Sequence, residues 1–503
     1  MRFFRTEQIR QIDADTIKCE PITSIDLMER AARRLADAIK QQYGGKKLYF
    51  AIFAGAGNNG GDALAVARML DACGERVGVW LIAPGERLSP DCRVNLERLV
   101  ETSVETHICR DAFTPPALPA NTIIVDGLFG SGLSRPVAGL FADVIRFINS
   151  CSCDVVAIDI PSGLCGEKQF HTSEECIVCA DITLALQFPK LSLLLPENEC
   201  FVGDWHILDI GLHPIAIEQQ PGNFNYTEEK DIKVLMKPRR KFSHKGDFGR
   251  ALLVAGSRGM AGASILAARS SLRSGVGLLS VALPSCNNAM VQTTVPEAMT
   301  LPLCGENCID TLPQSEAFNA VGIGPGLGTS SETERAVLNF INECRVPMVL
   351  DADALNILAK NPDSLQTLPA GCILTPHVGE FTRLAGPAAD DYDRLMLAVE
   401  FAHEYRVCLV LKGAYTAVCS PDGECYYNST GNPGMATGGS GDVLTGIALA
   451  LLARGYNAVE AARIAVYVHG LAGDIACRQY GETALTAGDI VNALPSAWKV
   501  LGC

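Results

Sequence analysis

Residues 48–74 read LYFAIFAGAGNNGGDALAVARMLDACG, and they contain a complete strand, loop and helix of an α/β fold. The apolar run 48–55 predicts a buried strand, and residues 61–74 carry apolar side chains at helical spacing. A glycine-rich loop joins the two segments. Apolar strands that alternate with helices are typical of a parallel sheet whose two faces are covered by helices. The stretch therefore predicts the start of such a sheet.

The same alternation continues along the rest of the chain, in two series separated by the polar segment 213–247. The boundary is placed near 217–225. We therefore expect an α/β protein with two domains, 1–217 and 225–503, each a three-layer αβα sandwich. Further strands are expected within 76–83, 122–130, 155–163, 249–257, 277–284, 319–328, 347–355, 371–380 and 407–416, followed by a hairpin around Pro421-Asp422-Gly423 and three closing helices.

Composition narrows the possible functions. The chain has 503 residues, a formal net charge of −14, 48% hydrophobic residues and 19% charged residues. These values are typical of a globular protein and argue against general nucleic-acid binding. No signal-peptide core is visible, and no uncharged apolar run reaches the roughly 18–20 residues that span a bilayer. We expect a cytoplasmic homo-oligomer that binds small molecules and has neither a nucleic-acid nor a membrane partner.

Two other compositional features have more than one interpretation. The 20 cysteines are interpreted as free thiols, although Cys176 and Cys179 form a lone C-x-x-C pair that also suits zinc or redox chemistry. A basic cluster in the polar segment is interpreted as a solvated connector, and the alternative is a rim for phosphates. This cluster consists of Lys237, Arg239, Arg240 and Lys241.

Polar side chains follow three of the expected strands of the first domain. They are Asn59, Asp126, Asp159 and Ser162. Because the carboxyl ends of parallel strands meet at one edge of a sheet, we expect these side chains to lie together. Their oxygens suit a hard cation, and the amide-rich loops beside them suit a phosphate. A nucleotide pocket assisted by a cation is therefore predicted. Asp62 has an alternative role, as a charge in the first turn of the following helix.

The second domain has three polar features at strand ends or helix starts. These are TPHVGE (375–380), KGAYT (412–416) and GGSGD (438–442). Consecutive glycine amides at a helix start bind a phosphate oxyanion. Asp442, directly behind them, is therefore interpreted as the base that acts on an attacking hydroxyl. The alternative for Asp442 is a helix-terminal charge that contributes about 0.3–1 kcal/mol to stability.

Two further residues of these features allow two interpretations each. His377 either contacts a ligand or caps the helix that follows it. Lys412 is either a phosphate partner or an exposed charge. The backbone of Gly413 and Ala414 is free to contact a nucleotide in either case.

Three segments of the first domain resemble the NAD(P)H-hydrate epimerase family: GAGNNGGDALAVA (55–67), DGLFGSGL (126–133) and AIDIPSGL (157–164). The resemblance covers roughly residues 1–215 and implies a Rossmann-like domain that inverts C6 of a hydrated nicotinamide ring. It implies K⁺ ligands at Asn59, Asp126 and Ser162, and a catalytic role for Asp159. Ala63 stands where many relatives have glycine, which is a small change. The hydrated nucleotide is implied to contact Asn58, Asn59, Gly60, Gly61, Asp62, Gly130, Ser131, Gly132, Leu133, Ser134, Arg135, Pro136 and Asp159.

The second domain resembles the NAD(P)H-hydrate dehydratase family of the ribokinase-like superfamily over about residues 235–500. The resemblance rests on HKGDFGRALLVAGSRGMAGA, GIGPGLG, LDADALN, TPHVGE, LKGAYT and NPGMATGGSGDVLTG. It implies that Ala263, Gly326, His377 and Asp442 contact the hydrated nucleotide. It also implies that an adenine nucleotide contacts Lys412, Gly413, Ala414, Tyr415, Thr416 and Gly441.

Together the two resemblances imply a bifunctional enzyme that repairs NADH hydrate and NADPH hydrate. It would epimerise the R and S forms and dehydrate the S form, with cleavage of ADP to AMP and phosphate. Mg²⁺ with ADP or ATP is implied for the second site and K⁺ for the first. One alternative is a ribokinase-type small-molecule kinase with an accessory domain. The other is a non-enzymatic role of the first domain as a ligand-binding scaffold.

Overall fold

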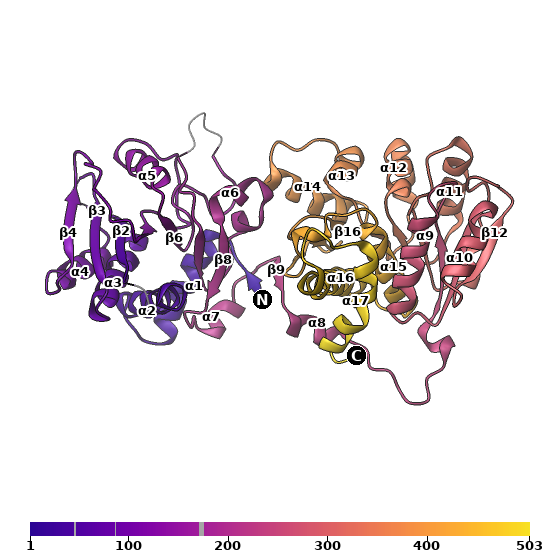
Figure 1. Cartoon of the computed structure of the whole chain (residues 1–503), viewed down its shortest axis with the longest axis horizontal. Helices are drawn as coiled ribbons and strands as arrows, with labels where there is room; N and C mark the ends of the chain where they lie inside the picture. The colour runs from indigo at the N-terminus through magenta and orange to yellow at the C-terminus, as the bar shows by residue number, and fades with distance from the viewer. Residues whose placement is uncertain (45–46, 86, 171–175) are drawn as a thin grey trace. The chain divides into compact units, whose positions relative to one another are not determined.

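The computed structural model describes residues 1–44, 47–85, 87–170 and 176–503 of the chain. Apart from Met1, which groups with the second unit, these residues form two compact units that meet in sequence between Gly222 and Asn223. Each unit is an α/β sandwich with mainly parallel strands, as the sequence predicts (Figure 1).

The first unit is built on a parallel sheet with the strand order β4-β3-β2-β5-β6-β7-β8. The strands predicted within 48–55, 76–83, 122–130 and 155–163 are confirmed as β2, β3, β5 and β6. The last two end before their predicted limits, because their polar ends form loops. The elements are β1 (Arg2–Phe3), α1 (Thr6–Cys19), α2 (Ser24–Tyr43), β2 (Tyr49–Gly55), α3 (Asn58–Ala72), β3 (Arg76–Ile82), α4 (Pro90–Leu99), β4 (Glu105–Cys109), β5 (Thr122–Gly127), α5 (Leu140–Ser150), β6 (Asp154–Ile158), β7 (Ile182–Leu186), α6 (Glu199–Val202), β8 (Asp204–Leu208) and α7 (Pro214–Glu218).

Helices cover both faces of this sheet, because successive strand residues point to opposite sides. Phe50 and Ile52 of β2 pack into one core with α2 and α3. Ala51 and Phe53 of the same strand pack into a second core with α5. The predicted three-layer αβα arrangement of the first unit is therefore confirmed, and the loops at the carboxyl ends of the strands are left to form a site.

The second unit contains the strand order β9-β18-β17-β16-β15-β14-β13-β10-β11-β12. Strands β10 to β16 are parallel to one another, whereas β17 is antiparallel to both β16 and β18. The predicted hairpin is confirmed as β17 and β18, and the three closing helices are α15, α16 and α17. The elements are β9 (Phe224–Thr227), α8 (Glu229–Leu235), β10 (Arg250–Val254), α9 (Ala261–Arg273), β11 (Leu278–Pro284), α10 (Asn288–Thr294), β12 (Met299–Leu303), β13 (Ala320–Ile323), α11 (Ser331–Glu343), β14 (Met348–Leu350), α12 (Asp353–Lys360), β15 (Ile373–Leu374), α13 (Val378–Ala385), α14 (Asp391–Glu404), β16 (Cys408–Leu411), β17 (Ala417–Cys419), β18 (Cys425–Asn428), α15 (Ser440–Ala453), α16 (Ala458–Tyr480) and α17 (Ala487–Val500).

Helix α15 is buried on all sides, and every residue from 443 to 453 is buried. It packs in one core with α9, α16 and α17. Gly446 permits the close approach of α9, since a Cβ atom there would lie 2.0 Å from Ser270 Oγ and 2.2 Å from the Ala267 carbonyl oxygen. A helix that is apolar all round belongs in a core or a membrane. Within the described ranges, no helix is both long enough and apolar enough to cross a bilayer.

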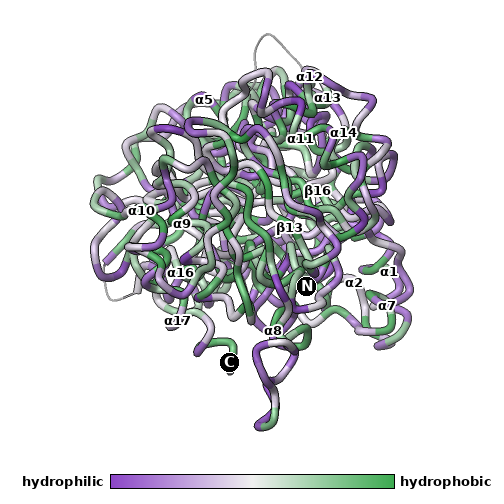
Figure 2. Tube along the Cα trace, turned by 90° about the vertical axis from the view of Figure 1, so that its right-hand side faces the viewer, coloured by the Kyte–Doolittle hydropathy of each residue, from purple (hydrophilic) through white to green (hydrophobic). Residues whose placement is uncertain are grey.

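The basic cluster lies in the connector after α8, which is mostly hydrophilic in Figure 2. Lys237 Nζ donates to the Gly455 carbonyl oxygen at 2.7 Å, and an Arg239 guanidinium nitrogen donates to the Gly275 carbonyl oxygen at 2.7 Å. Gly455 follows α15 and Gly275 precedes β11, so these contacts lie at the amino ends of the strands. The solvated-connector interpretation is therefore correct, and the phosphate-rim interpretation is wrong for a site at the carboxyl ends.

Candidate functional site

In the first unit, Asp126 joins the ends of β5 and β6. The Ser162 hydroxyl donates to Asp126 Oδ1 at 2.6 Å, and the Ser162 backbone N–H donates to Oδ2 at 2.7 Å. Asp126 is completely buried. Burial raises the pKa of Asp126 to about 6, and the hydrogen bonds from Ser162 and Leu128 act against this rise. The structure thus holds a buried carboxyl group where a strand-end ligand site was predicted.

Asn59 and Ser162 complete the predicted cation site around the turn at 129–130. The Ser162 hydroxyl accepts from the Phe129 N–H at 2.8 Å. Asn59 lies against Gly130, where a Cβ atom would be 3.5 Å from Asn59 Oδ1. One buried carboxylate beside amide, hydroxyl and carbonyl oxygens is a donor set that suits a hard cation of low charge. The residues present therefore fit K⁺.

Asp159 follows β6 and forms an ion pair with Lys190. The Lys190 side chain is only 2% exposed, and its Nζ also donates to the carbonyl oxygens of Leu186 at 3.1 Å and Phe188 at 3.3 Å. Asp159 has a backbone φ of 68°, a left-handed conformation that costs free energy for a residue with a Cβ atom. Its Oδ2 faces the Ser131 N–H at 3.4 Å. The carboxylate is therefore held in place next to the start of the loop that begins at Gly130.

The predicted phosphate loops reach this cluster only in part. Gly130 lies against Asn59 and Ser131 faces Asp159, as described above, and the Gly132 carbonyl oxygen accepts from Arg10 at 3.4 Å. The rest of that loop is at or near the surface: Leu133, Ser134, Arg135 and Pro136. In the other loop, Asn58 is exposed, whereas Gly60 and Gly61 are buried. Gly130 and Ser131 of the first loop and Asn59 of the second therefore border the cluster directly.

Asp62 is not a first-turn charge. Helix α3 begins at Asn58, and no acidic residue lies in its first turn. Burial raises the pKa of Asp62 well above its ordinary value, and Asp159 adds to the rise. Burial and Asp62 together raise the pKa of the Cys92 thiol to about 11. The helix-dipole interpretation of Asp62 is therefore wrong, and its carboxyl group belongs to the buried interior.

Lys190 was not identified from the sequence. It lies after β7, a strand that was also not predicted, and it belongs to no recognisable motif. A signal was nevertheless present, because Lys190 is the only charge in the apolar stretch ITLALQFPKLSLLL (182–195). A lone charge among apolar residues is expected to have a buried partner of opposite sign.

In the second unit, the glycine-rich loop ends at the start of α15. Gly439 caps the helix with φ of 91°, a left-handed conformation that glycine adopts without steric cost. Asp442 is the third residue of the helix. Burial raises the pKa of Asp442 to about 7, Asp351 adds to the rise, and Lys412 opposes it. A carboxyl group with a pKa near neutrality is suited to proton exchange with a substrate.

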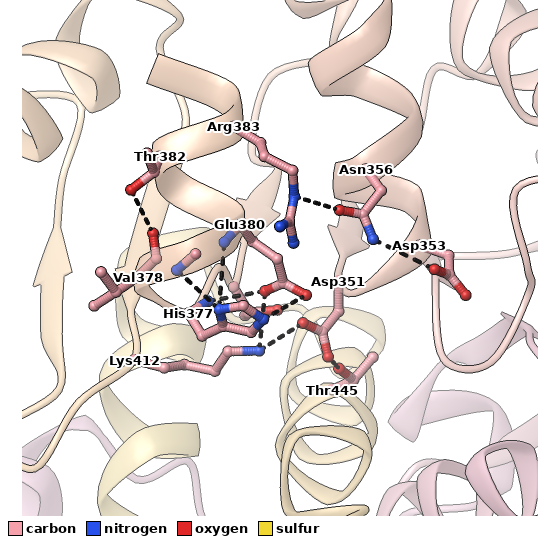
Figure 3. Close-up of polar contacts among 12 residues, drawn as sticks. Asp351, Asp353, Asn356, His377, Val378, Glu380, Thr382, Arg383, Lys412 and Thr445 are labelled. Atoms are coloured by element: carbon pink, nitrogen blue, oxygen red, sulfur yellow. Dashed lines mark hydrogen bonds and ion pairs between the residues drawn. The ribbon is translucent and has the colours of Figure 1, made fainter. Parts of the chain in front are cut away.

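Asp351, which directly follows β14, is the centre of a polar network beside this helix start (Figure 3). Lys412 Nζ donates to Asp351 Oδ1 at 2.9 Å and lies 3.7 Å from Glu380 Oε2. The Thr445 hydroxyl of α15 donates to Asp351 Oδ2 at 2.6 Å. Burial alone would lower the pKa of Lys412, but Asp351, Glu380 and Asp442 together raise it above its ordinary value. Lys412 is therefore a permanent positive charge at the helix start, and the exposed-charge interpretation is wrong.

His377 caps helix α13 (Figure 3). Its Nδ1 accepts from the backbone N–H groups of Gly379 at 3.0 Å and Glu380 at 3.3 Å. Its Nε2 lies 3.4 Å from Glu380 Oε1, and 54% of the side chain is exposed. The helix-cap interpretation is therefore confirmed. More than half of the side chain remains exposed, and a contact with the hydrated nucleotide stays a prediction.

The KGAYT sequence forms a tight turn next to the glycine-rich loop. The Thr416 hydroxyl donates to the Gly413 carbonyl oxygen at 3.0 Å, and Ala414 and Tyr415 lie between them. A Cβ atom on Gly441 would be 3.6 Å from Lys412 Nζ. The residues predicted to contact the adenine nucleotide therefore adjoin one another across two loops.

Ala263 and Gly326 lie together on the other side of the glycine-rich loop. A Cβ atom on Gly326 would be 3.1 Å from Ala263 Cβ, and one on Gly439 would be 2.5 Å from Leu266 Cδ1. Leu266 is one helical turn beyond Ala263 on α9. The start of α9, the loop at Gly326 and the cap of α15 thus converge on a common region.

No group of three or more His, Cys, Asp or Glu side chains is arranged to hold a metal ion among the residues that the structure describes. Near the glycine-rich loop, the carboxylates of Asp351 and Glu380 both contact Lys412. Mg²⁺ keeps several water ligands and is commonly bound through substrate phosphates and one or two carboxylates. A magnesium ion at this site would therefore enter chiefly with a nucleotide.

The fold and the two strand-end sites define a two-domain α/β enzyme in which a Rossmann-like unit precedes a ribokinase-like unit. Residues 24–192 match the family described as YjeF-related protein N-terminus, and residues 251–496 match NAD(P)H-hydrate dehydratase. The chain is 38% identical to the bifunctional NAD(P)H-hydrate repair enzyme Nnr of Moorella thermoacetica, across 94% of this chain and 92% of that protein. The chain belongs to the family of bifunctional NAD(P)H-hydrate repair enzymes.

Two further comparisons agree. The chain is 34% identical to the enzyme of the same name from Thermofilum pendens, across 100% of this chain and 97% of that protein. A solved structure of a ribokinase-like superfamily protein from Enterococcus faecalis is 27% identical, has a TM-score of 0.50, and matches 56% of this chain and 96% of its own. Relatives that share nearly the whole length do not favour a simple small-molecule kinase or a scaffold.

Proposed function

We propose that this protein repairs NADH hydrate and NADPH hydrate. The first unit interconverts the R and S forms at C6 of the hydrated ring, and the second unit dehydrates the S form while ADP is cleaved to AMP and phosphate. The observation that carries this proposal is membership of the repair-enzyme family over almost the full length of both proteins. The presence of a separate strand-end site in each unit supports it.

The dehydration begins at the C6 hydroxyl group, because hydroxide is a poor leaving group. In the proposed reaction Asp442, whose pKa is raised to about 7, takes the hydroxyl proton. The oxygen then attacks the terminal phosphorus of ADP, and AMP leaves. Loss of phosphate from C6, together with a proton from C5, restores the double bond of the nicotinamide ring. The net products are NADH or NADPH, AMP and phosphate.

The other residues of the second site bind and orient the reactants. Amides of residues 438–441 stabilise charge on the moving phosphoryl group, and Lys412 supplies a positive charge beside them. Mg²⁺ would neutralise charge on the nucleotide phosphates when it is bound. The proposed adenine-nucleotide contacts are Lys412, Gly413, Ala414, Tyr415, Thr416 and Gly441. The proposed hydrated-nucleotide contacts are Ala263, Gly326, His377 and Asp442.

In the first unit, we assign the catalytic carboxylate to Asp159, which Lys190 fixes at the mouth of the loop after Gly130. K⁺ held by Asn59, Asp126 and Ser162 would add a positive charge beside the loop amides and so favour a bound phosphate. The proposed hydrated-nucleotide contacts are Asn58, Asn59, Gly60, Gly61, Asp62, Gly130, Ser131, Gly132, Leu133, Ser134, Arg135, Pro136 and Asp159.

The proposal is tested with purified protein, a mixture of the R and S forms of hydrated NADH, Mg²⁺, K⁺ and either ADP or ATP. We expect recovery of the nicotinamide absorbance, release of one phosphate per NADH formed, and consumption of both forms. A stable phosphorylated product without NADH would contradict the proposal. The donor that supports the faster reaction identifies the preferred nucleotide, which we propose is ADP. Sedimentation would test the proposed homo-oligomer, and cell fractionation the proposed cytoplasmic location.

A further inference from the structure

Helix α1 places one of its faces across the first site. Thr6, Arg10 and Asp13 are spaced by four and three residues, so they lie along one side of the helix. The Thr6 hydroxyl donates to the Ser131 carbonyl oxygen at 3.3 Å, and an Arg10 guanidinium nitrogen donates to the Gly132 carbonyl oxygen at 3.4 Å. Both acceptors belong to the loop whose first residues border Asp159. The same face therefore carries Asp13 into the region behind this loop.

Three titratable groups from three different elements interact electrostatically with Asp13. Asp159 follows β6, Lys190 follows β7, and Asp62 belongs to α3. Burial raises the pKa of Asp13 to about 7, Asp159 adds to the rise, and Lys190 opposes it. Burial raises the pKa of Asp62 well above its ordinary value, and Asp159 and Asp13 add to the rise. Asp13 therefore interacts with the ion pair of Asp159 and Lys190 and with a second carboxyl group, that of the buried Asp62.

Asp13 differs from its neighbour Asp15 on the same helix. Asp15 accepts hydrogen bonds from Gln11 at 2.9 Å and Lys18 at 3.0 Å, which is the behaviour of an ordinary surface carboxylate. Neither oxygen of Asp13 has a hydrogen-bond or ion-pair partner within the described part of the chain. The Asp13 side chain is partly buried, and a carboxyl group that is removed from water without a hydrogen-bond partner costs free energy. Since no structural contact offsets this cost, Asp13 is better explained by a group that binds in the site.

We propose that Asp13 is a second catalytic residue of the first site and acts as the acid opposite Asp159. This inference rests on the proposed epimerisation and deepens it. Inversion at C6 needs two proton transfers, because the bond from C6 to the ring nitrogen must open and close again on the other face. Two carboxyl groups in different protonation states satisfy that need. Asp159, paired with Lys190, is the proton acceptor, and Asp13 is the proton donor.

Each proton that is transferred in the proposed epimerisation is later returned. The C6 hydroxyl group gives its proton to Asp159, a carbonyl bond forms at C6, and the bond from C6 to N1 breaks. The electron pair of that bond goes to N1, which takes the proton of Asp13. After rotation about the bond from C5 to C6, N1 returns its proton to Asp13 and attacks the opposite face of C6. The oxygen regains its proton from Asp159, so no atom is gained or lost.

The test compares the wild-type protein with D13N, D13E and the control D15N. The measurement is the initial rate of R-to-S interconversion of hydrated NADH, corrected for the spontaneous rate, across a range of pH. We expect D13N to lose about 10²–10⁴-fold in rate and D13E to recover part of the loss. D15N should match the wild type. The wild-type rate should fall as the pH rises above about 7, because the acid form of Asp13 is then lost, and D13N should lack this fall.

Two results would overturn the inference. The first is a D13N rate and pH profile equal to those of the wild type. The second is a wild-type epimerisation rate that does not fall at alkaline pH. This measurement uses the wild-type protein alone, so it does not depend on whether a variant folds. Absence of any interconversion by the wild-type protein would instead contradict the proposed epimerase activity itself. Circular dichroism and thermal unfolding of D13N and D15N separate loss of catalysis from loss of structure.

Discussion

Lys412 Nζ lies 2.9 Å from Asp351 Oδ1, although the two residues are 61 positions apart in the chain. Lys412 comes from the end of β16 and Asp351 from the end of β14, and β15 lies between these strands in the sheet. The Asp351 carboxylate also accepts from Thr445 of α15. One buried carboxylate thus connects two strand ends to the helix that carries Asp442. The polar network therefore stabilises the fold and also belongs to the candidate site.

The first prediction separates catalysis by Asp442 from a helix-end charge. We expect D442N to lower the rate of dehydration by about 10²–10⁴-fold and to leave epimerisation unchanged. Asp489 is the matched control, because it is likewise the third residue of its helix, α17. D489N should lower the free energy of unfolding by about 0.5–2 kcal/mol without affecting dehydration. If D442N and the wild type dehydrated the substrate at equal rates, Asp442 would be only a charge at the helix end and not the base.

The second prediction concerns pH. The folded protein raises the pKa of Asp442 from 3.8 to about 7, so the folded state binds this proton more tightly than the unfolded chain does. The contribution of Asp442 to the free energy of unfolding is therefore present below pH 4 and is lost as the pH rises to about 7. The rate of dehydration should rise over the upper part of this range, because the base must be ionised. Thermal unfolding should show that D442N gains stability relative to the wild type between about pH 5 and about pH 8.

The third prediction uses the ion pair between Lys412 and Asp351. K412M should lower the free energy of unfolding by on the order of 3 kcal/mol, because it leaves a buried carboxylate without its main partner. The double variant K412M/D351N should recover much of the lost free energy of unfolding, whereas its binding of ADP should remain weak. Chemical denaturation and calorimetric titration with ADP give the two measurements. A double variant as unstable as the sum of the single variants would show that the two residues are not coupled.

The fourth prediction concerns the cation site of the first unit. Epimerisation by the wild-type protein should be faster in KCl than in choline chloride of equal ionic strength. D126N should remove this difference, because the neutral amide lacks the only charge among the three proposed ligands. The rate of dehydration by the same variant serves as the internal control and should not change. Equal epimerisation rates in the two salts would count against a K⁺ site.

The fifth prediction tests the contact between α15 and α9. G446A should lower the free energy of unfolding by about 1–3 kcal/mol, because the added methyl group overlaps Ser270 and Ala267. G262A in α9 is the control, since a Cβ atom at Gly262 would meet nothing within 4 Å. It should be neutral or stabilise the protein by up to about 1 kcal/mol. Urea denaturation of both variants checks the contrast.

Local sequence patterns predicted the central strands and the loops behind them. β2, β5 and β6 are continuous apolar runs, so their burial and their polar ends were visible without any tertiary information. β4 was missed because its side chains are mostly exposed, as expected for an edge strand that lacks an apolar run. β7 and β8 were missed as short segments inside a long irregular region. Lys190 was missed for the same reason, because its position depends on β7, which the sequence pattern did not predict.

The electrostatic partners could not be predicted in the same way. Asp351 appears in the sequence as part of LDADALN and Lys412 as part of LKGAYT, and nothing local links them. Asp13 looks like any acidic residue on an amphipathic helix until α1 is seen to cross the loop at Ser131 and Gly132. Burial and neighbouring charges together set the pKa of Lys412 and of Asp13, and both are properties of the whole fold. The motifs therefore gave the positions of the site residues, whereas their charge states required the structure.

Helix α15 is buried from residue 443 to residue 453, and its first turn carries Asp442. Amide hydrogens along such a helix exchange with solvent only when the whole unit opens, while those of an exposed loop exchange in its folded state. Asp442, the proposed catalytic base, is thus carried by a helix that we expect to open only with the whole unit. On heating, dehydration should survive until the second unit unfolds cooperatively and then disappear in the same transition.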